Sequence, residues 1–107
     1  MMIRAVDIGQ TDQFRKYSNP EIAQQKARKY LGKNAIIYRS TRKNKKYMIQ
    51  DGNSGVWVHF GAIPYEDFTK HKDKKRRSSY ISRATGIRGN WRTNPYSPNS
   101  LSINILW

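Results

Sequence analysis

The stretch that decides the fold is residues 45–60, with the sequence KKYMIQDGNSGVWVHF. Apolar residues gather at positions 47–49 and again at 56–60, and Asp, Gly, Asn and Ser fill the positions between them. Aromatic and β-branched residues on both sides of such a turn are typical of an antiparallel hairpin. We therefore predict strands at residues 45–50 and 56–60.

A third strand is predicted just before this hairpin. Residues 34–39 contain the apolar run Ala35-Ile36-Ile37-Tyr38, and residues 41–44 form another link that is rich in turn formers. Two hairpins in succession give a three-stranded antiparallel meander.

Helices are predicted on both sides of the meander. Asn19 or Ser18 can cap a helix that begins at Pro20, and Gly32 can end it. A second helix is predicted over residues 72–85, where apolar positions recur at helical spacing after a run of basic residues.

The last residues carry two conflicting patterns. The apolar residues from Leu101 to Trp107 alternate as in a strand, whereas Ser97-Pro98 is typical of a helix start. The Ser-Pro pair favours a short terminal helix or turn. The predicted fold class is α+β: a small single domain over residues 1–107, with a three-stranded meander, two main helices and a short C-terminal element. Residues 1–18 are predicted to be a loosely ordered arm.

The charge balance is extreme for a chain of 107 residues. Lys and Arg number 21 and Asp and Glu number 7, so the formal net charge is +14. Self-repulsion at this charge opposes compaction, and an anionic partner relieves it. Nucleic acid, an anionic membrane surface and an acidic protein are the candidate partners.

The basic residues fall into three clusters: a stripe on the first helix, the tip of the first hairpin, and the beginning of the second helix with the segment after it. A basic hairpin tip beside a basic helix can contact phosphates along both edges of a groove. Three such runs with few acids favour polyanion binding over a merely solvated face. The candidate nucleic-acid-binding residues are Arg42, Lys43, Lys45, Lys46, Lys72, Lys74, Lys75, Arg76, Arg77, Arg83, Arg88 and Arg92.

Aromatic residues are interleaved with the basic ones. Trp57 lies on the strand face opposite Val56 and Val58, and either base stacking or a place in the core is open to it. The other strand aromatics are expected to form the core. The chain has no RNA-recognition signature, so DNA is favoured over RNA as the partner.

No metal site or catalytic centre is predicted. Glu66, Asp67 and Asp73 could gather near His71 as in a metal-dependent nuclease, but such acids serve equally well near helix starts and in ion pairs. No Gly-rich phosphate loop, nucleophile elbow or His-Glu-x-x-His motif occurs. We expect a protein that is not an enzyme and needs no cofactor, with a nuclease as the remaining alternative.

The sequence also bears on location. The chain has no cysteine, which excludes disulfides and thiolate zinc sites. No run approaches the roughly 18 apolar residues of a membrane span, and the first residues lack the apolar region of a signal peptide. We expect no membrane insertion and a place inside the cell or inside a particle made there. The oligomeric state is left open.

Residues 65–77, YEDFTKHKDKKRR, are followed by Tyr80, Arg83, Trp91 and a segment that runs from NPYSPN at 94–99 to a closing Leu-Trp. This pattern resembles a family of short, basic proteins of nucleocytoplasmic large DNA viruses. The region before the pattern is also similar, so the resemblance covers about residues 45–107. It implies a viral origin and an α+β domain suited to a virion or a replication factory, and it transfers no biochemical role.

The predicted function is nucleic-acid binding, with sequence-tolerant contact to the backbone phosphates of viral duplex DNA in a packaging or nucleoid role. The alternative is a minor virion structural protein whose basic face docks acidic capsid or core proteins. The expected location is the viral factory, the host cytoplasm or nucleus, or the virion.

Overall fold

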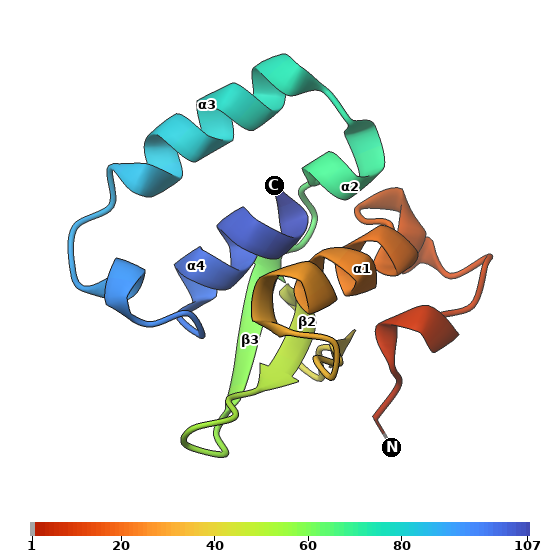
Figure 1. Ribbon diagram of the computed structural model, residues 1–107. Helices are drawn as coiled ribbons and strands as arrows, with labels where there is room; N and C mark the ends of the chain where they lie inside the picture. Colours follow the sequence, from red (N-terminus) through yellow and green to blue (C-terminus); the bar gives the residue numbers. More distant parts are fainter. Residues whose placement is uncertain (1) are drawn as a thin grey trace.

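The computed structural model describes residues 2–107, and its sheet consists of three antiparallel strands in the order β1-β2-β3. The strands are β1 (Tyr38–Arg39), β2 (Lys45–Gln50) and β3 (Trp57–Ala62). The α+β class and the meander are confirmed, and β2 has the predicted bounds. Figure 1 shows the helices in front of this sheet, with α3 standing farther out.

β1 is shorter than the predicted strand because Gln24 takes over the hydrogen-bonding groups of the segment before it. The Gln24 side chain is buried; its Nε2 donates to the carbonyl of Ala35 at 2.8 Å, and its Oε1 accepts from the amide of Ile37 at 3.0 Å. Residues 34–37 are therefore bonded to α1 instead of lengthening the ladder with β2.

The first helix, α1 (Pro20–Leu31), has the predicted bounds. Asn19 caps it, since its Oδ1 accepts from the amide of Ile22 at 3.2 Å. Ala23 and Ala27 are fully buried on its inner face. Small residues at this spacing let the helix pack closely against the C-terminal segment 102–106 and the N-terminal turn at residues 5–7.

The helix predicted over residues 72–85 is present but begins two residues later, and a separate short helix precedes it. The structure has a short α2 (Phe68–His71) and a longer α3 (Lys74–Thr85), and Lys72 between them adopts a left-handed conformation with φ 55°. Asp67 and Asp73 cap the two helices in turn. Lys72 is thus the end of α2 and not the first residue of the long helix.

The chain ends in a short helix, α4 (Pro98–Leu101), which continues as a π-helical turn, η4 (Ser102–Leu106). The predicted short C-terminal helix is thereby confirmed. Leu101, Ile105 and Leu106 are buried, and Figure 1 shows this segment running between α1 and α3.

The loosely ordered arm predicted over residues 1–18 is not what the structure shows. Short 3-10 turns form at η1 (Ala5–Asp7) and η2 (Gln13–Lys16), and Ala5, Ile8 and Phe14 belong to the core. Backbone bonds of 3.0 and 2.8 Å join this segment to the edge of the sheet beside β1. The apolar residues of this segment are spaced too irregularly to match a helix or a strand pattern. For that reason the sequence did not predict that they pack into the core.

The core is aromatic at its centre, as expected. Tyr47 and Phe60 are fully buried with ring centroids 5.8 Å apart, and the edge of Phe14 meets the Tyr47 ring at 5.1 Å. Each ring comes from a different element, so the sheet and the N-terminal segment are packed into one core.

None of the helices among residues 2–107 combines the length and the apolar character that crossing a membrane requires.

Candidate nucleic-acid interface

Lys46 is the one predicted phosphate contact that the fold buries. Its side chain is 3% exposed, and its ammonium lies 3.2 Å from a carboxylate oxygen of the fully buried Asp67. Burial lowers the pKa of Lys46 and the negative charge of Asp67 raises it; burial has the larger effect, so the pKa is lowered. The prediction that Lys46 contacts phosphate is therefore wrong, because its ammonium is buried and pairs with Asp67 inside the protein.

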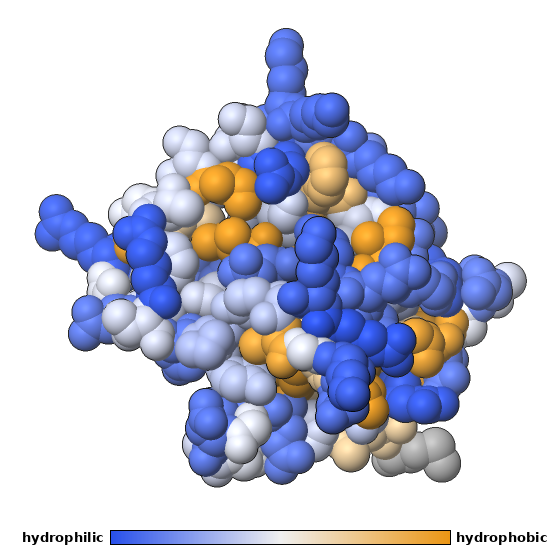
Figure 2. Space-filling view, viewed as in Figure 1, coloured by the Kyte–Doolittle hydropathy of each residue, from blue (hydrophilic) through white to orange (hydrophobic). Residues whose placement is uncertain are grey.

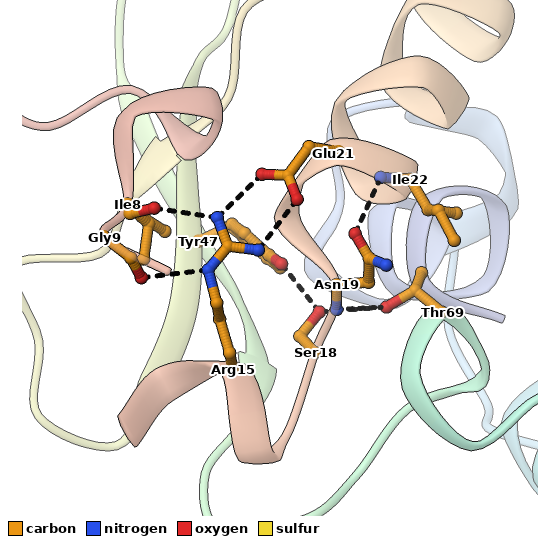
Figure 3. A network of polar contacts seen from close by, with 9 residues as sticks. All are labelled: Ile8, Gly9, Arg15, Ser18, Asn19, Glu21, Ile22, Tyr47 and Thr69. Atoms are coloured by element: carbon orange, nitrogen blue, oxygen red, sulfur yellow. Dashed lines mark hydrogen bonds and ion pairs between the residues drawn. The ribbon is translucent and has the colours of Figure 1, made fainter. Parts of the chain in front are cut away.

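A chain of hydroxyl groups extends from this ion pair to the start of α1. The Thr69 hydroxyl donates to Asp67, so the hydroxyl of Ser18, 3.1 Å away, must donate to Thr69. Tyr47 in turn donates to Ser18 at 2.6 Å, and burial raises the pKa of Tyr47 well above its usual value, which keeps the phenol protonated. Figure 3 shows Ser18 meeting both partners beside Asn19.

Arg15 is a second basic residue whose charge is used inside the fold. Its guanidinium contacts both carboxylate oxygens of Glu21, at 2.7 and 2.8 Å, and donates to the carbonyls of Ile8 and Gly9 (Figure 3). This bidentate pair raises the pKa of Arg15 and lowers that of Glu21. Arg15 therefore clamps the N-terminal segment to α1.

Every one of the seven acidic residues has a structural partner. Asp51 and Asp73 accept hydrogen bonds from backbone amides of a turn and of α3. The other five form ion pairs, which are Asp7 with Arg4, Asp12 with Arg39, Glu21 with Arg15, Glu66 with Arg76 and Asp67 with Lys46. Five of the 21 Lys and Arg are thus paired, and within residues 2–107 the other 16 have no acid in ion-pair range.

The densest group of Lys and Arg residues lies on α3. Lys74, Lys75, Arg76 and Arg77 are exposed on its first turn, and Ala84 is the residue that the helix buries. The only acid paired with this group in the described chain is Glu66, 4.0 Å from Arg76, and both side chains are largely solvated. Such a pair contributes little, so it leaves most of the positive charge of α3 available to a partner.

α1, which carries a basic stripe, lies across the C-terminal segment from α3, and its Lys26 is close enough to Arg77 for their charges to interact. Burial and then the positive charge of Arg77 lower the pKa of Lys26. Arg77 itself is held in place, since its Nε donates to the carbonyl of Trp107 at 2.7 Å and its guanidinium lies 5.6 Å from the Phe68 ring centroid. Figure 2 shows hydrophilic side chains over most of the face that carries these two helices, with apolar patches between them.

The basic hairpin tip lies beside the end of β3, which borders a pocket that α3 also lines. Arg42 and Lys43 are exposed in the turn, and the amide of Ile63 donates to the carbonyl of Asn44 at 3.1 Å. Lys45 pairs with Ala62 across the sheet, and Ala62 lines a pocket together with residues of α3. The hairpin and helix clusters are therefore neighbours, with one strand end between them.

That pocket has a volume of about 530 Å³ and lies between α3, the end of β3 and η4. Lys75, Arg76 and Arg83 contribute to it from α3, and Leu106 and Trp107 contribute from the C-terminal segment. Sequence reasoning placed the three cations among the candidates but missed Tyr65, Ser79, Tyr80 and Trp107. The four-residue spacing of Lys75, Ser79 and Arg83 was the available signal.

The remaining candidates lie away from this pocket. Trp57 is half-buried with its ring 5.5 Å from that of Tyr38, edge to face, and it lines a separate hollow. Arg92 stacks over Trp91 at 4.6 Å and donates to a backbone carbonyl of α3, while Arg88 is exposed in the loop after α3. The structure does not bring these three side chains together with the α3 cations around the pocket.

The acids of the alternative nuclease site do not converge. The Nδ1 of His71 accepts from the amide of Asp73 at 2.9 Å, while Asp67 is buried against Lys46 and Glu66 faces Arg76. Within residues 2–107, no three His, Asp or Glu side chains lie close enough together to hold a metal ion.

The comparison with protein families finds a match to part of the chain. Residues 35–84 match the model of a family described as a family of unknown function, DUF5754. This region begins before β1 and ends within α3, so it includes the hairpin tip and the cations of the first α3 turn. Neither curated proteins nor solved structures give a match.

Proposed function

We propose that this protein binds nucleic acid, with duplex DNA as the preferred partner, through backbone phosphates and with little sequence preference. The observation that carries the proposal is the uncompensated charge of α3. Its first turn presents four exposed cations, and among residues 2–107 only two acids lie beside them: Asp73, which caps the helix, and Glu66, which forms a solvated pair with Arg76. A polyanion is the partner that this surface can neutralise.

The arrangement of the cations supports phosphate contact more than base readout. They lie on a helix and on a hairpin tip, which hold positive charges at fixed separations, and each carries a long side chain that reaches outward. The proposed contacts are Arg42, Lys43, Lys45, Lys72, Lys74, Lys75, Arg76, Arg77 and Arg83. Phosphate contacts position a protein on a duplex without reading its sequence, so binding should be sequence-tolerant.

The setting of this binding rests on the sequence pattern alone. The resemblance to basic proteins of large DNA viruses supports a role in packaging or organising viral DNA, in the infected cell or in the virion. The proposed role is that of a binding protein and not of a catalyst.

Salt dependence tests the proposal. Fluorescence anisotropy with labelled duplex DNA between 50 and 200 mM salt should show binding that weakens steeply. Six to ten phosphate contacts correspond to a slope of about −5 to −9 in log K against log salt. Duplexes of unrelated sequence should bind alike. Absence of binding to duplex DNA, single strands and RNA at 50 mM salt would refute the proposal.

A pair of charge variants shows whether α3 carries the binding. Lys74→Ala with Lys75→Ala removes two charges from α3, and Lys16→Ala with Lys33→Ala removes two exposed charges elsewhere. We expect the α3 pair to lower the salt slope by about 2 and the control pair to change it far less. Equal effects of the two pairs would mean that binding depends on the total charge of the protein and not on a site at α3. Competition by polyglutamate as strong as competition by DNA would favour the docking of an acidic protein.

A further inference from the structure

The pocket beside α3 differs from the rest of the basic surface because much of its lining is apolar. Leu106, Ala62 and Trp107 contribute to it, and the Trp107 ring stacks on that of Tyr80 with centroids 4.1 Å apart and planes inclined by 6°. Its volume of about 530 Å³ falls within the usual range of small-molecule sites. A purely phosphate-binding surface would not need such a hollow.

Gly61 keeps this lining in place. Its φ is +82°, which side chains rarely adopt, and a Cβ at this position would lie 2.8 Å from Cδ1 of Leu106. It would also lie 3.2 Å from Cβ and Cδ of Lys46. A side chain here would displace two residues that line the pocket, so the glycine preserves the hollow.

The charged lining comes from one side of α3. Lys75, Ser79 and Arg83 follow one another at four-residue spacing and all line the pocket, as does Arg76. Glu66 is the only acid among the lining residues that the structure describes, and the ammonium of Lys46 is already neutralised by Asp67. The lining therefore joins a net positive charge to an apolar, aromatic surface.

We infer that this pocket takes one unstacked nucleotide of the bound nucleic acid. The base packs against Tyr80, Leu106 and Trp107, while Lys75, Arg76 and Arg83 hold the phosphates beside it. An anion with a flat, apolar body is the ligand that this combination fits, and nucleotides have that chemistry. The inference rests on the proposed function, because the nucleotide belongs to the strand that the basic surface binds.

Three duplexes test the inference. One is fully paired, one carries a single unpaired adenine, and one carries an abasic site at the same unpaired position. The last two have equal numbers of phosphates, so a difference between them reports the base alone. We expect about tenfold tighter binding of the unpaired adenine than of the abasic site, in line with the usual worth of stacking one base.

Two matched variants locate the effect. Ser79→Trp places a large ring in the pocket, whereas Ser78→Trp places the same ring on the same exposed helix at a position that does not line the pocket. Ser79→Trp should abolish the preference for the unpaired adenine and keep the affinity for paired duplex. Ser78→Trp should keep both. Circular dichroism of both variants checks that they are folded.

The contrary outcomes are distinct. Equal binding of adenine and abasic duplexes by the unmodified protein would overturn the inference and leave the proposed function standing. Failure to bind all three duplexes would overturn the proposed function. Titration with AMP distinguishes a third outcome. If AMP binds, Ser79→Trp abolishes this binding, and the protein shows no preference among the three duplexes, the pocket takes a free nucleotide. That outcome would overturn the inference that the nucleotide belongs to a bound strand.

Discussion

α1 and α3 are both 12 residues long and both begin with a side-chain cap, yet they relate to the rest of the molecule in opposite ways. α1 buries Ala23, Gln24 and Ala27, and Gln24 also holds the segment before β1. α3 buries Ala84 and is held mainly by Tyr80 and Arg77 against Trp107. α1 is part of the core, whereas α3 displays charge from a few anchoring points.

This difference shows how a small domain can carry a net charge of +14 and still fold. The densest run of like charges lies on a helix that contributes little to the core, so the repulsion within that run opposes the packing of the core only weakly. Solvent and a bound partner screen charges at such a position much better than they could in the interior.

The largest expected contrast comes from placing the same charge on both helices. Ala27→Asp buries an unpaired carboxylate at a position with no exposed surface, whereas Ser82→Asp adds one on the exposed side of α3. We expect Ala27→Asp to lower the free energy of unfolding by about 4 kcal/mol or more, and Ser82→Asp to change it by about 0.5 kcal/mol or less. Urea denaturation measures both. Similar losses would show that α3 is as much a part of the core as α1.

The next contrast is between two lysines that line the same pocket. Lys46→Met leaves the buried carboxylate of Asp67 without its cation, so we expect a loss of about 3 kcal/mol in unfolding free energy. Lys75→Met removes an exposed charge and should cost about 0.5 kcal/mol or less while weakening DNA binding. Denaturation and anisotropy should therefore rank the two variants in opposite orders, and the same ranking in both assays would contradict the separation of roles.

A smaller effect is expected from the anchor of α3. Trp107→Leu removes the stack with Tyr80 and should cost about 2 kcal/mol. Amide hydrogen exchange should quicken in α3 more than in α1, because α3 depends on few other contacts. Trp57→Leu is the control, since Trp57 packs on the sheet against Tyr38. Equal acceleration in both helices would mean that they open as one unit.

The smallest effect is a pH dependence. Burial, followed by the charges of Arg42 and Lys45, lowers the pKa of His59; burial, followed by the charge of Arg76, lowers that of His71. A base with a lowered pKa binds its proton more readily in the unfolded chain, so stability falls as the pH falls through 6.5 and levels off below the folded pKa.

We expect Tm to fall by about 3 °C or less between pH 7.5 and pH 5.5, because both rings are only partly buried. Replacing both histidines by asparagine should flatten this part of the profile. The lowered pKa values of Asp12 and Glu21 affect stability in a separate range, below about pH 4.5, where those carboxylates become protonated. An unchanged slope in the double variant would show that other groups titrate there.

The sequence predicts what local chemistry determines. The cap at Asn19, the proline after it and Gly32 set both ends of α1, and the run of residues 45–50 sets β2. The sequence did not predict that Lys46 is buried and pairs with Asp67, which lies 21 residues away. The alternation of a strand carries no information on a partner from another element. The break at Lys72 had a signal, since Asp67 and Asp73 are two cap residues six positions apart.

The use of every carboxylate as a helix cap, a turn acceptor or an ion-pair partner has a consequence for how the charge of this protein can change. Exposed cations such as Lys74 can be exchanged singly without loss of a structural contact, whereas the loss of an acid such as Asp73 or Glu21 removes a helix cap or a clamp. Random substitution therefore drifts towards neutrality far more easily than towards greater positive charge. A high charge that persists across variants of this sequence would accordingly record selection for it, while the buried and capping acids, such as Asp67 and Asp73, would be kept for reasons of folding alone.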